Sequence, residues 1–191
     1  MKARLLGVTF LTLCLSGCAL EGPLPSTGFM PVNAFGQSVV GQDPAIATFN
    51  EALFAFTHPK MMQNRPAEMA LAVASLDAMA GQFSTGGRWM AFNAIAKMQM
   101  LQARRRVRAI LGISETAPSQ AVIDQLVTVS HALDAGDKAA ALAALSGGVF
   151  TRPAPQTLAL LTHFPYVPIA DHAVMTANAD LFPSGGGNQL R

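Results

Sequence analysis

Residues that could carry out chemistry are few in this sequence, and the histidines are the first group to consider. The chain has four histidines, and two of them, His163 and His172, flank the turn-forming segment from Phe164 to Pro168. Asp171 precedes His172 directly, so a turn here would bring one carboxylate and two imidazoles together. Such a cluster could orient a general base or bind a metal ion weakly. The sequence favours the alternative, in which these side chains only fix the turn.

The familiar arrangements for catalysis and metal binding do not occur in the sequence. There is no HExxH spacing, no GxSxG and no Ser-x-x-Lys. The acidic residues are scattered along the chain rather than paired as glycoside hydrolysis requires. We therefore expect no catalytic residues, no bound metal and no cofactor.

A run of basic residues from Arg104 to Arg108 is the strongest charge feature after the N-terminus. On a helix, Lys97, Arg104 and Arg108 would share one face, with Arg105 to one side of it. These four residues could contact anionic lipid headgroups, a phosphate-bearing ligand or an acidic partner. The alternative is a solvated helix end whose cations complement the helix dipole.

Arg106 differs from its neighbours because it falls beside the apolar stripe of the same segment. We expect its side chain to turn inward and to form a buried ion pair with Asp77 or Asp124. A buried cation without such a partner would be strongly destabilising.

The most specific pattern lies at the N-terminus. Lys2 and Arg4 precede an apolar run from Leu5 to Leu15, and two small residues then precede Cys18. Spanning a bilayer takes about 20 apolar residues, and this run is shorter. Its length and its basic start are typical of a secretory signal peptide.

The residues Leu15, Ser16, Gly17 and Cys18 resemble the lipobox of bacterial lipoprotein precursors. The resemblance covers only the N-terminal tenth of the chain and implies a processing class rather than a fold. It implies lipid on the Cys18 sulfur, removal of residues 1–17 and acylation of the new amine. Two or three acyl chains would anchor the protein firmly, whereas one holds only marginally. An ordinary secretory signal with a chance cysteine is the alternative.

The resemblance also implies a location. The residue after Cys18 is Ala19 rather than aspartate, which in the sorting rule of these lipoproteins favours the outer membrane over the inner one. The expected location is the periplasmic face of the outer membrane.

Removing residues 1–17 changes the composition that bears on function. Cys14 is lost, so Cys18 becomes the sole cysteine and no intramolecular disulfide is expected. Lys2 and Arg4 are two of the 13 basic residues, and without them the basic and acidic residues balance at 11 each. This balance argues against a nucleic-acid partner. Charged residues make up only 13% of the chain, which favours apolar surface covered by a partner or lipid, or an alanine-rich bundle.

The sequence predicts four regions: a signal peptide over 1–17, a lipidated and Pro/Gly-rich tether over 18–42, a helical domain over 43–182 and a disordered tail over 183–191. Within the tether, four apolar residues could dock back onto the domain: Phe29, Met30, Val32 and Phe35.

Apolar residues recur at helical spacing between proline and glycine breaks. Helices are expected from Asp43-Pro44 to His58, from near Asn64 to Ser84, and over about 88–111, 118–135, 138–145, 155–163 and 168–180. No segment alternates like a strand. The predicted fold is an all-α single antiparallel bundle of roughly five to seven helices after a disordered tether.

These observations lead to one main functional hypothesis. We expect a non-enzymatic lipoprotein, held in the membrane by lipid on Cys18, that serves as an accessory or assembly subunit of an envelope complex. The alternative is a helical lipoprotein that binds a lipid or small ligand in its methionine-lined interior. A hydrolase using His163, Asp171 and His172 is a third hypothesis.

Overall fold

Helices follow one another along the chain in the computed structural model, which describes residues 26–36, 41–85 and 87–183. They are α1 (Pro44–Thr57), α2 (Pro66–Thr85), α3 (Ala94–Leu111), α4 (Ser119–Asp134), α5 (Lys138–Leu145), α6 (Ala154–Thr162) and α7 (Pro168–Leu181), with a 3-10 turn, η1 (Gly87–Trp89), before α3. The described ranges contain no β-strand. The prediction of an all-α bundle is therefore confirmed.

Local sequence signals set several of the helix ends. The Asp43 carboxylate accepts hydrogen bonds from the backbone N–H groups of Ala45 and Ile46, and Pro44 occupies the first turn of α1, where its missing N–H costs nothing. Gly112 ends α3 with a φ of +69°, a conformation that side-chain-bearing residues adopt poorly.

The start of the third helix differs from the expectation. The sequence pattern predicted a helix from about residue 88, but α3 begins at Ala94. The Asn93 side chain accepts a hydrogen bond from the Ile95 N–H and so caps α3 at this point. Trp89 belongs instead to the turn η1, where its ring packs edge-on against Phe83 with centroids 4.9 Å apart.

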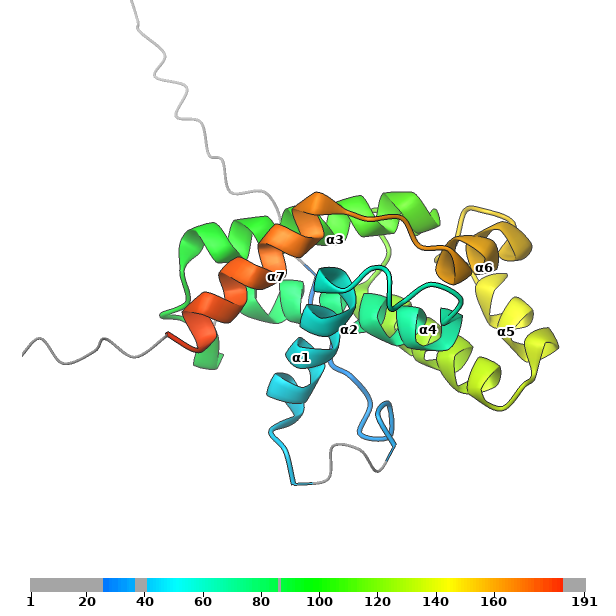
Figure 1. Cartoon of the computed structure of the whole chain (residues 1–191), viewed down its shortest axis with the longest axis horizontal. Helices are drawn as coiled ribbons and strands as arrows, with labels where there is room; N and C mark the ends of the chain where they lie inside the picture. The colour runs from blue at the N-terminus through cyan, green and yellow to red at the C-terminus, as the bar shows by residue number, and fades with distance from the viewer. Residues whose placement is uncertain (1–25, 37–40, 86, 184–191) are drawn as a thin grey trace, which may run out of the picture.

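Helix α2 lies at the centre of the arrangement (Figure 1). On one side, α1, α2, α3 and α7 form a ring in which each helix packs on the next; on the other, α4, α5 and α6 complete a second ring with α2. Figure 1 shows α7 towards one end of the molecule and α5 and α6 at the opposite end. Because α2 belongs to both rings, it is buried on nearly every side.

The interior is filled by side chains rather than hollow. Four methionines are completely or almost completely buried, namely Met62, Met69, Met79 and Met100. A partly open cavity beside Met62 and Phe164 measures about 10 Å³, which is about the space of one water molecule. The methionines therefore serve as core packing, and this packing does not support a ligand chamber inside the bundle.

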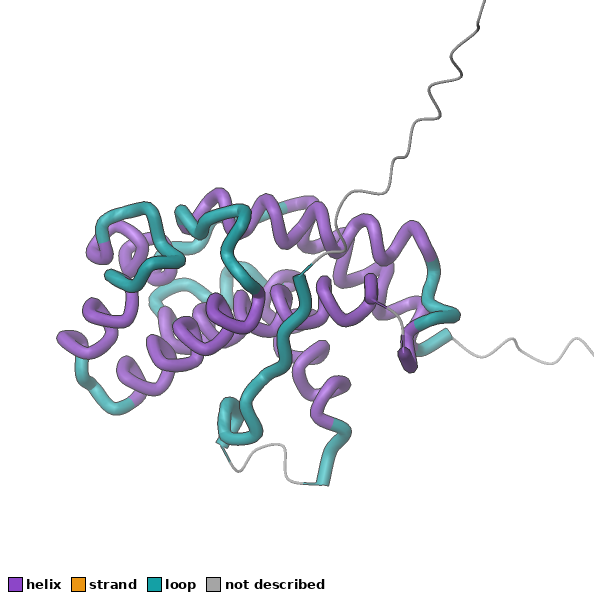
Figure 2. Tube along the Cα trace, turned by 180° about the vertical axis from the view of Figure 1, so that it is seen from behind, coloured by secondary structure: helices purple, strands orange, loops and turns teal. Residues whose placement is uncertain are grey.

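Residues 26–36, called here the N-terminal segment, run across the helices (Figure 2). The sequence assigned them to the tether, but Ala34 is buried and Met30 and Phe35 pack against the core. Phe29 and Val32, which were also expected to dock, are largely exposed. The predicted tail over 183–191 lies outside the described residues except for Pro183.

Candidate functional site

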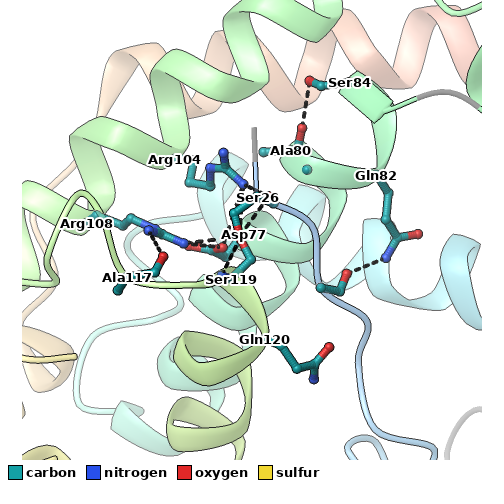
Figure 3. A network of polar contacts seen from close by, with 12 residues as sticks. Ser26, Asp77, Ala80, Gln82, Ser84, Arg104, Arg108, Ala117, Ser119 and Gln120 are labelled. Atoms are coloured by element: carbon teal, nitrogen blue, oxygen red, sulfur yellow. Dashed lines mark hydrogen bonds and ion pairs between the residues drawn. The ribbon is translucent and has the colours of Figure 1, made fainter. Parts of the chain in front are cut away.

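A buried carboxylate lies near the middle of the central helix. Asp77 is 2% exposed, and both of its oxygens accept hydrogen bonds from Arg108 of α3 (Figure 3). The Arg108 Nε lies 2.6 Å from Oδ2, and Nη2 lies 2.8 Å from Oδ1. This two-point geometry is the strongest form of a charged hydrogen bond. It joins α2 to α3 within the protein interior.

A second arginine occupies the same buried region. Arg104 donates from Nη1 to the Ser26 carbonyl at 2.7 Å and to the Ser119 hydroxyl at 3.0 Å. The same nitrogen lies 3.9 Å from the Asp77 carboxylate. Burial lowers the pKa of Arg104 because the cation loses water, and the charge of Asp77 partly offsets this effect. Two cations thus share one buried carboxylate.

Ser26 connects this charged group to the N-terminal segment. Its hydroxyl accepts a hydrogen bond from the Ser119 N–H at 2.8 Å, and its carbonyl accepts one from the Ser119 hydroxyl at 3.0 Å. Helix α4 needs such a partner because Pro118, at the position before it, provides no side-chain cap. Ser26 therefore supplies the cap from 93 positions away. We call Ser26, Asp77, Arg104, Arg108 and Ser119 the polar clasp.

The close approach of Ser26 also depends on a glycine in α2. A Cβ on Gly81 would lie 2.6 Å from the Ser26 carbonyl oxygen and 3.0 Å from the Thr27 Cα. Any larger side chain would push the segment away. Beyond Ser26, Gln82 donates to the Gly28 carbonyl, and Gln120 both accepts from and donates to the backbone of Phe29. The segment is thereby attached to α2, α3 and α4.

The basic residues singled out in the sequence do not form one exposed surface. Arg104 and Arg108 are 9% and 4% exposed, so the expectation of a solvated or ligand-facing role is wrong for both. Arg105 is exposed and Lys97 is half-buried. The reason is that α2, the first residue of α4 and the N-terminal segment lie against the face of α3 that carries Arg104 and Arg108.

The expectation for Arg106 is also wrong, because this residue is exposed. Asp77 was correctly proposed as the partner of a buried arginine, but the arginines that it contacts are Arg104 and Arg108. Asp124 instead accepts a hydrogen bond from Gln120 on the surface of α4.

Within the described ranges, no hydrogen bond or salt bridge joins His163, Asp171 and His172 to one another. The Tyr166 hydroxyl donates to the Asp171 carboxylate at 2.7 Å, and this bond raises the pKa of Tyr166. His163 ends α6 and lines a surface groove of about 520 Å³ with residues of α5 and α6, including Lys138. His163 and His172 are exposed. In the part of the chain that the structure describes, no three His, Cys, Asp or Glu residues are grouped as a metal site.

A second polar site was not anticipated from the sequence. A surface groove of about 550 Å³ lies between the N-terminal segment and helices α1, α2 and α4, with Glu51, Glu68 and Asp134 among its lining residues. Burial raises the pKa of Glu51, the negative charge of Glu68 adds to this effect, and Arg65 opposes it. The acids come one from each helix, so only the packing of the helices brings them together.

The lipobox residues Leu15, Ser16, Gly17 and Cys18 lie outside the described residues. None of the helices within the described ranges has both the length and the apolar character needed to cross a bilayer. No protein-family model matches the chain, and no match is found among curated proteins or among solved structures.

Proposed function

We propose that this chain is a bacterial lipoprotein, anchored through lipid on Cys18 at the periplasmic face of the outer membrane. Its helical domain acts there without catalysis, as an accessory or assembly subunit of an envelope complex. The observation that carries the proposal is the Leu15-Ser16-Gly17-Cys18 motif after a short, basic-led apolar run. The polar clasp supports it, since it fastens the chain to the helices eight positions after the anchoring cysteine.

The role as a subunit is supported by apolar side chains at the surface. Exposed large apolar residues occur on several elements: Phe29, Val32, Phe54, Met61, Met90, Ile95, Met98, Tyr166, Met175 and Phe182. Four of these are methionines, whose flexible side chains suit adaptable protein contacts.

The anchor is tested by metabolic labelling with palmitate in cells that express the whole chain. We expect label on the wild-type protein and none on Cys18→Ser. Cys14→Ser is the matched control, because it replaces the other cysteine of the chain and should leave labelling intact. Equal labelling of Cys18→Ser and wild type would disprove the lipoprotein assignment.

The role as a subunit is tested by photo-crosslinking in intact cells. A crosslinking amino acid is placed at Met61 or Met175, which are exposed, and at Lys138 of α5 as a polar control. We expect one defined product at an apolar position that is absent at the control position. Only uncrosslinked monomer at both apolar positions would contradict the proposal.

The second candidate function is binding of a small ligand, and the groove that contains Glu51 favours it. The groove combines acidic side chains with the apolar residues Phe54 and Leu71, which suits a ligand with a cationic group and an apolar body. Thermal stabilisation of the protein by a panel of such amines, lost in Glu51→Gln, would support this candidate.

A further inference from the structure

The distance between the proposed anchor and the folded domain is short. Ser26 is held by Arg104 and Ser119 and lies eight peptide steps beyond Cys18. An extended chain covers about 3.3–3.6 Å per residue, so these steps span at most about 29 Å. A folded domain of this length is about 40 Å across. If Cys18 carries lipid, as proposed above, the surface near Ser26 must face the membrane, because the tether cannot reach around the domain.

The surface beside Ser26 is provided by α3. Ser26 contacts Arg104, and Leu101 and Lys97 lie one and two turns earlier on the same side of that helix. Met98 and Arg105 lie together on one side of this stripe. We call Lys97, Met98, Leu101 and Arg105 the anchor-side face. Met98 is 52% exposed, Arg105 is exposed, and Lys97 and Leu101 are half-buried.

The charge of α3 is strongly one-sided. The helix carries five basic residues and no acidic residue. Asp77 balances part of the buried charge of Arg104 and Arg108. No salt bridge within the described ranges engages Lys97 or Arg105, and the exposed Lys97 ammonium donates one hydrogen bond, to the Met90 carbonyl at 3.2 Å. Asp180 of α7 lies at the start of α3, where it accepts a hydrogen bond from the Asn93 N–H.

We infer that the anchor-side face rests on the membrane that holds Cys18, with Lys97 and Arg105 on lipid phosphates and Met98 and Leu101 against the headgroup–acyl boundary. Cations beside a small apolar surface are the combination that binds anionic bilayers. The inference depends on the proposed lipid anchor, but it adds the orientation of the domain. The anchor places the protein at the membrane, and α3 determines which side of the domain faces the lipid.

The sequence makes this orientation measurable. Cys18 is the sole cysteine once residues 1–17 are removed, so an introduced cysteine can carry a single fluorophore. Ala94 is exposed at the edge of the anchor-side face, and Ala139 is exposed on α5, which does not pack against α3. The lipidated protein, which begins at Cys18, is reconstituted into phosphatidylethanolamine–phosphatidylglycerol vesicles that contain a spin-labelled quencher lipid.

We expect strong quenching of the fluorophore at Ala94→Cys and little at Ala139→Cys. Adding Arg105→Glu should lower the quenched fraction at position 94 about fivefold or more, from the loss of one headgroup-binding cation. Arg106→Glu is the matched control, because it makes the same charge change at an exposed position of α3 that lies outside the anchor-side face. It should lower the quenched fraction less than Arg105→Glu does.

Two results would overturn the inference: equal quenching at positions 94 and 139, or equal effects of Arg105→Glu and Arg106→Glu. Either result counts only when the chain floats with the vesicles and carries palmitate. If it carries no lipid on Cys18, the proposed function fails first and the inference fails with it. If it is lipidated and floats, but shows either of the two results above, only the inference fails.

Discussion

Removing the carboxylate of Asp77 should be among the most destabilising single changes in this protein. The change Asp77→Ala takes away two charged hydrogen bonds from Arg108, at 2.6 and 2.8 Å, and the counter-charge 3.9 Å from Arg104. Neither arginine can easily move to water, because Ala117 and Ser26 hold their Nη1 atoms through backbone carbonyls. Two buried cations would then remain without an anion.

Breaking a buried ion pair by removing one partner costs about 3–5 kcal/mol. Because two cations lose the same partner here, we expect the upper part of that range. The total free energy of unfolding of a domain is about 5–15 kcal/mol, so a large share would be lost. At about 2–4 °C per kcal/mol for a chain of this size, the melting temperature should fall by about 8–20 °C.

The measurement is urea and thermal unfolding, followed by far-ultraviolet circular dichroism and by the fluorescence of Trp89. Asp124→Ala is the matched control, because Asp124 is an exposed aspartate within a neighbouring helix, and it should change stability by about 0.5 kcal/mol or less. The cost of Asp77→Ala should also shrink in an Arg108→Met background, where one of the two cations is gone. A loss below about 1 kcal/mol for Asp77→Ala would refute the role given to the clasp.

Three further changes test other parts of the structure. Gly81→Ala should destabilise the protein by about 1–3 kcal/mol, since a Cβ would collide with the Ser26 carbonyl. The peptide bonds near Ser26 should also become more sensitive to protease, and unchanged proteolysis would count against this contact. Asp43→Ala should lower the urea midpoint of unfolding, and Asp43→Asn should lower it clearly less, because asparagine also caps α1. Equal losses would assign the effect to the Arg88 ion pair instead. The pKa of Glu51 is raised on folding, so the negative charge of Glu51 opposes folding above its unfolded pKa. Glu51→Gln should therefore raise the melting temperature at pH 7, and this gain should shrink towards pH 4. A gain independent of pH would exclude the charge of Glu51 as the cause.

Helix positions could be predicted well wherever a local signal decides them. Asp43-Pro44 and Gly112 mark helix ends through backbone geometry alone, and α5 begins and ends at the expected residues. The start of α3 was misplaced because Trp89 and Phe92 fit the apolar spacing of the helix. They pack on Phe83 of α2 from outside α3, so their spacing reflects a tertiary contact.

The polar clasp could not be predicted in the same way. A single-helix projection puts Arg104 and Arg108 on a polar face, and only the position of Ser26 and Asp77 reveals that this face is covered. Their burial follows from contacts 31 and 78 positions away along the chain. The aspartate could still be proposed, because a buried cation needs a carboxylate.

The packing of α1 against α7 has a consequence for how this protein is made. The first and last of the described helices close the ring that α1, α2, α3 and α7 form, so that ring stays open until α7 has been synthesised. Contacts between such distant segments form late and slow folding. A nascent chain that stops short of α7 leaves the flank of α1 uncovered, and quality-control proteases could recognise that exposed surface.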